Sequence, residues 1–259
     1  TDDDPAWAPV VDAIAEACAN LFMVLASERI VLGGGVINDR LWLVDAVGRS
    51  AAKKLGAVSV MVLGTAGDHM LDHPRLLPFY EALLEENLAL GVHVGWSCPA
   101  VSNLYSHIYP SGVIAFHIPL LMAFTALVSG GVMDRFPDLR VVFLEAGCQW
   151  VPFILERMHH RYKNQGSTLR KFLPQTAPIQ KLPVMEYIKR GNIYFSTEVE
   201  DEILPHVLNL VGETQVIFGS DMPHGDRERC AARMLQERSD ISDTAKLNIL
   251  DKNPARLYG

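Results

Sequence analysis

Short apolar runs rich in β-branched residues alternate along this chain with longer amphipathic stretches. The runs lie at 29–36, 57–64, 88–96, 139–147, 192–198 and 214–221. Each is nearly continuous in hydrophobicity, which is typical of strands buried on both faces of a parallel sheet. The amphipathic stretches at 40–55, 75–87, 117–134, 150–163, 202–211 and 226–238 predict helices. Such alternation predicts βαβ units and therefore an α/β fold.

The number of runs leaves two architectures open. A closed (β/α) barrel uses eight strands, whereas this chain has six runs and begins with a predicted helix from Val10 to Ala26. Either the sheet is open and doubly wound, or about two βα units of a barrel are missing. The second case would leave two open sheet edges and an exposed barrel interior. No linker is visible, and we interpret residues 1–259 as one domain.

Charge and cysteine content narrow the class of protein. The 23 basic and 30 acidic residues give a net charge of −7 with no Lys/Arg cluster, which argues against a nucleic-acid partner. Cys18, Cys98, Cys148 and Cys230 lie far apart and form no CxxC pair. Together with the acidic start TDDDPAW, which is no signal peptide, they predict reduced thiols in a cytoplasmic protein.

Residues 87–133 contain no Asp, Glu, Lys or Arg. The part at 112–133 is long enough to span a bilayer, but Pro119 and the Gly130-Gly131 pair argue against a membrane helix. We expect instead a helix that is buried against the sheet and against another subunit. The sequence therefore predicts no membrane span and a homodimer contact near 112–133.

Ionisable side chains stand at or near the carboxyl ends of four runs: His93, Glu145, Glu198 and Asp221. In parallel α/β folds these ends share the edge at which active sites lie. Taken alone, a histidine in a strand is more often a hydrogen-bonded core residue, and a carboxylate after a strand is more often the N-cap of the next helix. The four together predict a metal or acid–base site, because isolated charges at such depth are costly unless paired or coordinated.

Asp221 is the strongest single candidate. It lies at the end of the last run, in GSDMPHGD, where a carboxylate is suited to bind a divalent metal and to take a proton from bound water. His224 follows three residues later and is predicted to orient Asp221 or to contact substrate. The alternative for His224 is a plain loop histidine.

A substrate wall is predicted after the third run. Segment 97–116 is long for a βα connection, and such loops often line substrate sites. We assign Tyr105 and His107 of this segment to substrate binding, together with Trp96 and Glu198.

A histidine pair follows the second run. His69 and His73 are spaced i, i+4, which on a helix would face one metal, but Pro74 favours a loop. We interpret His73 as structural and keep His69 as a substrate-binding candidate. No GxSxG, P-loop or GxGxxG motif is present.

Long segments within residues 40–259 carry a recognisable combination of motifs. They are LDHPRLLPFYEALLEENLALGVHVG, GGVMDRFPDLRVVFLEAGCQWVPFILERM, NIYFSTEVEDEILPHVL, VIFGSDMPHGD and the ending NPARLYG. In this order they resemble the amidohydrolase superfamily, in the branch related to aminocarboxymuconate-semialdehyde decarboxylase. No single segment is specific, but the combination is.

The resemblance implies a (β/α)8 TIM barrel whose strands three to eight are the six runs, with the first one or two βα units missing. It also implies one divalent metal, most often zinc, with His93 matching the fifth-strand histidine ligand and Asp221 the eighth-strand aspartate. Members are decarboxylases, hydratases and hydrolases of small, usually carboxylated or aromatic substrates.

Two departures from the family pattern bear on the site. The metal pair of the first strand, HxH or ExH, is missing, and Glu145 stands where the family often has histidine. A metal held by His93, Asp221 and Glu145 would be under-ligated and weak. We expect a metal-dependent lyase or hydrolase in which Asp221, Glu145 and His224 are catalytic. The alternative is a metal-free barrel that binds or scaffolds other molecules or catalyses chemistry without metal.

Overall fold

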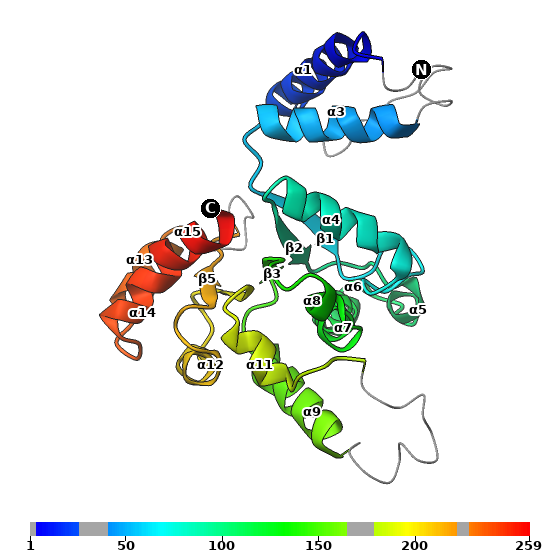
Figure 1. Ribbon diagram of the computed structural model, residues 1–259. Helices are drawn as coiled ribbons and strands as arrows, with labels where there is room; N and C mark the ends of the chain where they lie inside the picture. The colour runs from blue at the N-terminus through cyan, green and yellow to red at the C-terminus, as the bar shows by residue number, and fades with distance from the viewer. Residues whose placement is uncertain (1–3, 26–40, 165–178, 222–227) are drawn as a thin grey trace, which may run out of the picture. The chain divides into compact units, whose positions relative to one another are not determined.

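The computed structural model describes residues 4–25, 41–164, 179–221 and 228–259. The chain divides into two compact units, with the boundary after Val58, and each is considered by itself (Figure 1). The run predicted at 29–36 and residue His224 lie outside the described residues. The interpretation of 1–259 as one domain stays a prediction.

The first unit contains a pair of packed helices, α1 (Trp7–Leu25) and α3 (Leu41–Lys54). Small and branched side chains fill the contact between them: Ala15 and Cys18 from α1, Val47 and Ala51 from α3. The Lys54 ammonium lies 2.9 Å from Asp12 and 3.0 Å from Glu16, and these two carboxylates raise the Lys54 pKa. Both helices coincide with predicted ones.

The second unit is built on five parallel strands paired in chain order. They are β1 (Ser59–Leu63), β2 (Ala89–His93), β3 (Val141–Leu144), β4 (Ile193–Thr197) and β5 (Val216–Phe218). Each coincides with a predicted run. A doubly wound sheet reverses its strand order partway. The sequential order of these five strands therefore favours the arc of a barrel over an open, doubly wound sheet.

Helices lie around this sheet (Figure 1). Their bounds are η1 Pro74–Leu76, α4 Leu77–Glu85, α5 Pro99–Ser102, α6 Ile108–Ile114, α7 Ile118–Ser129, α8 Val132–Arg135, α9 Trp150–Asn164, α11 Val184–Lys189, α12 Leu204–Val211, α13 Ala231–Glu237, α14 Asp243–Leu247, η3 Asn248–Lys252 and α15 Asn253–Tyr258. The helix predicted over 117–134 is two helices, because Gly131 adopts a left-handed φ of 83° between them. The loop predicted over 97–116 contains α5 and α6, so that prediction was wrong.

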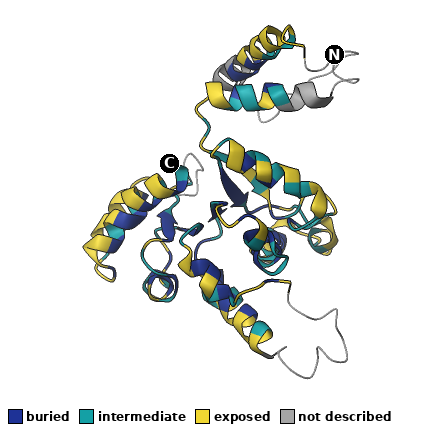
Figure 2. Ribbon diagram, in the orientation of Figure 1, coloured by how far each residue is buried: buried dark blue, intermediate teal, exposed yellow. Residues whose placement is uncertain are grey.

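The two faces of the sheet pack against different partners. Val141, Phe143 and Phe195 face the helices and join the main core, where the Phe143 and Phe195 rings contact Trp150. The opposite face carries Ala89, Val142, Tyr194 and Ile217, which pack against Leu257 of α15. Strands β2 to β5 are mostly buried, and Figure 2 shows exposed residues along the outer surfaces of the helices.

Strand β1 was predicted to be buried on both faces, but one of its faces is exposed. Met61 is 61% exposed and Leu63 is 40% exposed, whereas every residue of β4 is buried. Among the described residues β1 pairs only with β2. Continuous hydrophobicity identified the strand correctly but did not reveal which of its faces is covered.

Helix α7 is a core helix of the second unit. Leu120, Phe124 and Leu127 are fully buried, and α7 contacts β2, α8 and α9. Residues Ile108–Ser129 are apolar and long enough to cross a membrane, but half of the most hydrophobic window is buried inside the protein. A turn at 115–117 also separates α6 from α7. A core helix passes the same test of length and composition, so the segment is weak evidence for a membrane span.

We predict that stability declines in alkali because of Tyr187. Burial, and the hydrogen bond that its hydroxyl donates to Asp134 Oδ2 at 2.7 Å, raise the pKa of Tyr187 to about 12. The folded chain therefore keeps this phenol neutral while the unfolded chain ionises it near the ordinary pKa of 10.0. The free energy of unfolding should fall as pH rises from 10 to about 12.

The test is urea unfolding measured at steps of pH, for the wild type and for Tyr187→Phe. The variant is expected to be less stable at pH 8, because the bond to Asp134 is lost, but to show a shallower decline above pH 10. Parallel declines in the two proteins would contradict the prediction.

Candidate active site

Strand alternation places two of the predicted site residues on one face of the sheet. His93 is four residues after Ala89, and Glu198 is four residues after Tyr194. Ala89 and Tyr194 both lie on the face opposite the main core, which packs against Leu257 of α15. Because side chains alternate along a strand with a period of two, His93 and Glu198 continue this face at the carboxyl ends of β2 and β4. Asp221 stands three residues beyond the end of β5 and has a left-handed φ of 52°, so strand alternation does not place it.

Glu145 reaches the same face by a different route. Leu144 packs on the face opposite the main core, so simple alternation would turn Glu145 toward the main core. Its backbone instead adopts a left-handed φ of 62°, and its carboxylate contacts His93 Nε2. The Glu145 N–H donates to Ser196 Oγ at 3.0 Å, which ties the turn after β3 to β4.

Left-handed backbone is uncommon for residues other than glycine. Among the described residues only Asn87, Glu145 and Asp221 show it outside glycine. Two of these three stand at predicted site positions at strand ends. Such conformations carry a cost and cluster at active sites, where the surrounding structure enforces them.

His93 has a defined ring orientation. Its Nδ1 lies 2.8 Å from the carbonyl oxygen of Val94, and because a carbonyl only accepts, Nδ1 carries the proton. Nε2 therefore faces the Glu145 carboxylate as the nitrogen available either to a second proton or to a metal ion. Metal-binding histidines commonly donate their other ring N–H to a backbone carbonyl in this way.

Glu198 and Asp221 line one small hollow after β4 and β5, together with Ser220 and Glu228. The N–H of Gly219 donates to the Thr197 carbonyl at 3.0 Å, which continues the β4–β5 pairing toward this hollow. The four predicted residues thus form two pairs on successive strand ends, His93 with Glu145 and Glu198 with Asp221.

The predicted three-residue metal set is only partly assembled. His93 and Glu145 are in contact, but within the described ranges no group of three or more His, Cys, Asp or Glu side chains is placed to hold a metal ion. The tautomer of His93 and the adjacent carboxylate suit a divalent cation, so the donor chemistry fits a metal. A metal ion bound by His93 and Glu145 would need further ligands besides these two.

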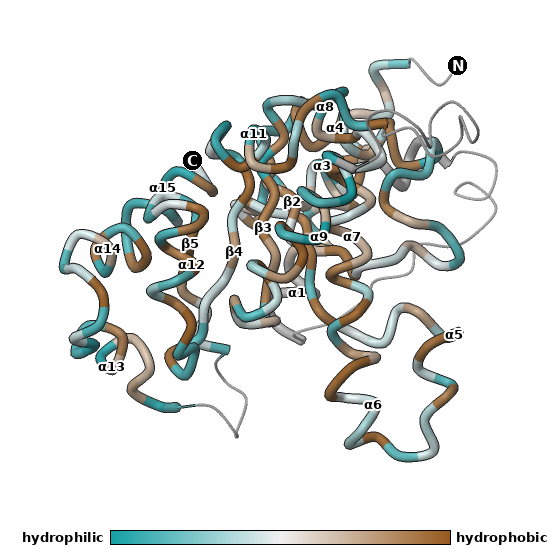
Figure 3. The backbone as a smooth tube through the Cα atoms, turned by 90° about the horizontal axis from the view of Figure 1, so that it is seen from below, coloured by the Kyte–Doolittle hydropathy of each residue, from teal (hydrophilic) through white to brown (hydrophobic). Residues whose placement is uncertain are grey.

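The predicted substrate wall has a structural anchor. Trp96 donates its indole N–H to Ser111 Oγ at 2.8 Å, and its ring packs on Phe116 with centroids 4.5 Å apart. Tyr105 is half-buried and His107 is exposed at the start of α6. Figure 3 shows α5 and α6 extending from the second unit, and Tyr109 of this segment is 83% exposed. Substrate binding by Trp96, Tyr105 and His107 stays a prediction.

The histidine pair after β1 lies in a loop, as predicted. The rings of His69 and His73 stack with centroids 3.8 Å apart. His73 Nδ1 accepts the Arg75 N–H at 3.2 Å as the N-cap of η1, which supports its structural interpretation. His69 is half-buried, and its role in substrate binding stays a prediction.

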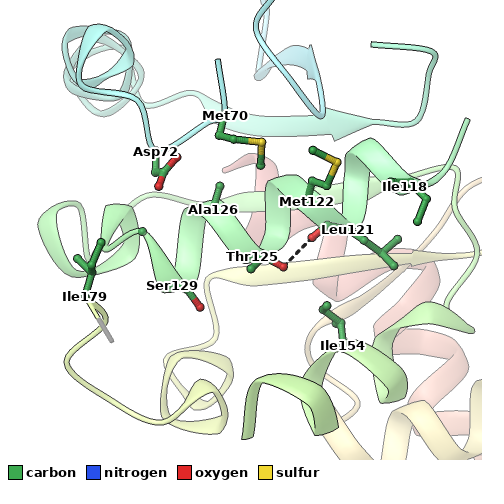
Figure 4. A pocket seen from close by; sticks show the side chains of 11 residues that line it. Met70, Asp72, Ile118, Leu121, Met122, Thr125, Ala126, Ser129, Ile154 and Ile179 are labelled. Carbon is green, nitrogen blue, oxygen red and sulfur yellow. Dashed lines mark hydrogen bonds between the residues drawn. The ribbon is translucent and has the colours of Figure 1, made fainter. Parts of the chain in front are cut away.

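A separate groove lies along α7. A cavity of about 500 Å³ runs along α7 and is lined by apolar side chains such as Ile118, Leu121, Met122 and Ile154 (Figure 4). None of the predicted site residues lines it.

Sequence analysis missed two residues that shape the site, Ser196 and Asp201. Ser196 holds the backbone of Glu145, and the buried Asp201 carboxylate binds the turns after both β3 and β4. Strand alternation could have placed Ser196 on the site face. Asp201 stands among other acids in STEVEDE, and nothing local distinguishes it.

Comparison with known proteins identifies the family. The Amidohydrolase family profile matches residues 6–259, almost the whole chain. The chain belongs to this family. The 2-amino-3-carboxymuconate-6-semialdehyde decarboxylase of Dictyostelium discoideum is 24% identical over 212 residues, covering 82% of this chain and 56% of that protein. This member of the amidohydrolase family therefore spans about half the length of this curated relative.

Solved amidohydrolase structures show the same fold. The 5-carboxyvanillate decarboxylase of Sphingomonas paucimobilis matches with a TM-score of 0.66 and 21% identity, covering 96% of this chain and 72% of that one. The 2,6-dihydroxybenzoate decarboxylase from Rhizobium gives 0.65 and 20%, covering 96% and 76%. The 5-carboxyvanillate decarboxylase of Novosphingobium aromaticivorans, whose structure contains manganese, gives 0.70 and 17%, covering 96% and 70%. The α/β fold expected from the sequence is confirmed.

We predict that Gly147 cannot be replaced without disturbing the turn after β3. Gly147 has a φ of 58°, and a Cβ there would lie 2.7 Å from Asp201 Oδ1 and would also meet Gln149 Oε1. Gly147→Ala should lower the free energy of unfolding by roughly 1–3 kcal/mol and displace Glu145.

Gly191→Ala is the matched control, because Gly191 also has a positive φ, 81°, but a Cβ there would meet nothing within 4 Å. Chemical denaturation of both variants separates backbone strain from the clash. Equal losses in the two variants would show that the clash with Asp201 is unimportant.

Proposed function

We propose that this chain is part of a metal-dependent decarboxylase that acts on a small aromatic carboxylic acid. The observation that carries the proposal is the contact between His93 Nε2 and the Glu145 carboxylate, next to the Glu198–Asp221 hollow, at the carboxyl ends of parallel strands. The family membership supports it, and so do the decarboxylase names of several relatives. Hydration and C–N hydrolysis use the same groups and are the neighbouring possibilities within the family.

Each residue has a proposed task. His93 binds a divalent metal through Nε2, with its ring fixed by the Val94 carbonyl. Glu145 and Asp221 supply carboxylate oxygens, and manganese or zinc is the proposed ion. A bound metal would supply Lewis-acid polarisation of the substrate carboxylate or phenolate.

Proton transfer is assigned to Asp221. When a carbon–carboxylate bond breaks, its electron pair stays on the ring carbon, carbon dioxide leaves, and the carbon needs a proton. The Asp221 carboxyl group is proposed to deliver this proton, with His224 orienting it. Glu198, which shares the hollow with Asp221, is proposed to contact the substrate's polar substituents.

A second candidate is a metal-free barrel that binds or scaffolds another molecule. Two observations favour it: an imidazole and a carboxylate can satisfy each other directly, and the described residues hold no three-ligand cluster. Elemental analysis of the purified protein distinguishes the two candidates. A stoichiometric divalent metal supports the enzyme, and metal-free protein that binds no added Mn²⁺ or Zn²⁺ supports the alternative.

The decisive variant is Asp221→Asn. Because the amide cannot transfer the proton, we expect carbon dioxide release from 2,6-dihydroxybenzoate or 5-carboxyvanillate to fall by about 100-fold or more. The melting temperature should stay within a few degrees. Asp243→Asn, whose side chain is 99% exposed on α14, is the control and should keep wild-type turnover. Undiminished turnover in Asp221→Asn would remove Asp221 from the mechanism.

We propose that the predicted homodimer contact near 112–133 includes the α7 groove. This face is apolar, and a chain of net charge −7 would repel its copy least where charges are few. Sedimentation velocity at micromolar concentration should show a dimer, and Met122→Lys in the groove should shift it toward monomer. A wild-type monomer would refute the prediction.

A further inference from the structure

The Asp201 carboxylate is an almost fully buried charge-bearing group outside the set of predicted site residues. Asp201 is 1% exposed. Its Oδ2 accepts hydrogen bonds from the N–H of Cys148 at 2.9 Å, the Thr197 hydroxyl at 2.8 Å and the N–H of Glu198 at 3.1 Å. Its Oδ1 accepts from the Gln149 side-chain amide. Both carboxylate oxygens thus accept hydrogen bonds, and these bonds offset the cost of burying the charge.

These donors come from two different segments. Cys148 and Gln149 belong to the turn that begins at Glu145, whereas Thr197 is the last residue of β4 and Glu198 begins the turn that follows it. One carboxylate therefore crosslinks the backbone segments that carry two predicted site residues. Burial, with the Asp201 carboxylate second, raises the pKa of the Cys148 thiol above its usual value.

A third segment joins through Arg238, which follows α13. Its guanidinium donates to the carbonyl oxygens of Asp201 at 2.8 Å and Val199 at 3.2 Å. The same guanidinium pairs with Asp240 at 2.7 Å and 3.0 Å, which holds it in place. The turn bearing Glu198 is thus fixed from inside by the Asp201 side chain and from outside by Arg238.

The fit around the carboxylate is close. The Cβ that any other residue would add at Gly147 lies 2.7 Å from Asp201 Oδ1. Trp150 donates its indole N–H to the Gly147 carbonyl at 3.1 Å and closes the other side of the turn. The segment that contains left-handed Glu145 is thus held at one end by Ser196, which accepts the Glu145 N–H, and at the other by Asp201, which accepts from Cys148 and Gln149.

We propose that Asp201 is the positioning residue of this site: its buried carboxylate holds the Glu145 turn and the Glu198 turn in fixed relative register. Asp201 acts through these residues and touches no reacting atom. The consequence for catalysis rests on the function proposed above, but the consequence for backbone order does not. The two are therefore measured separately.

Backbone order is measured by amide hydrogen exchange, followed by NMR at Cys148 and Glu198. Asp201→Ala removes the acceptor of both amides, and their exchange should accelerate at least 10-fold. Asp201→Asn should stay near wild type, because the Asn oxygen can accept from both N–H groups while the Gln149 amide turns to accept from the new NH2. Thr197→Val, which deletes one donor, should give a smaller acceleration and serves if Asp201→Ala does not fold.

Asn253→Ala is the matched control. Asn253 is also a fully buried polar residue, but its amide binds the carbonyls of Glu213 and Val216 at the start of β5, away from the site. It should lower stability without accelerating exchange at Cys148 and Glu198 beyond the change seen in β2. If the Asp201 variants accelerate these amides no more than Asn253→Ala does, Asp201 is not a positioning residue.

Turnover provides the second measurement. In Asp201→Ala, kcat for carbon dioxide release should fall 10-fold or more at unchanged metal content, and Asp201→Asn should restore most of it. A wild type without decarboxylase activity would refute the proposed function, while the exchange rates would still decide the role of Asp201. Accelerated exchange with undiminished kcat would confine Asp201 to a structural role and overturn the proposal.

Discussion

The carboxyl ends of parallel strands meet at one edge, and everything inferred about the site depends on this geometry. Because β1 to β5 pair in chain order, His93, Glu145, Glu198 and Asp221 stand at neighbouring strand ends although they span about half of the chain. Strand pairing is thus the interaction that converts distant sequence positions into a site. The helices contribute by burying the other face of the sheet.

Alternation along the strands accounts for His93 and Glu198, whereas Glu145 and Asp221 both stand in turns with left-handed backbone. Glu145 lies out of phase with its strand and joins His93 only through its left-handed φ. This conformation needs support from its surroundings. Ser196 binds the Glu145 amide, Gly147 leaves room for a buried carboxylate, and Asp201 fills that room.

The sequence allowed the strands and the edge to be predicted because both follow from simple periodicity. The runs at 88–96 and 214–221, which contain His93 and Asp221, are apolar enough to be recognised as strands without knowledge of their tertiary contacts. What could not be predicted depends on contacts between distant segments. Asp201 looks like an ordinary surface acid in STEVEDE until Cys148 is placed beside it. The short helices around 97–116 carry no amphipathic period, and their anchor, Trp96 on Ser111, spans fifteen residues.

The exposure of β1 has a consequence for the solution behaviour of the protein. Met61 and Leu63 present apolar side chains to solvent on a strand that, within the described part of the chain, is hydrogen-bonded along one side only. A strand of this kind offers backbone donors and acceptors to any extended polypeptide, including another molecule of itself. Pairing of this edge with another extended chain would lower solubility at high concentration, and Met61→Lys or Leu63→Lys would oppose it by placing a charge on the edge.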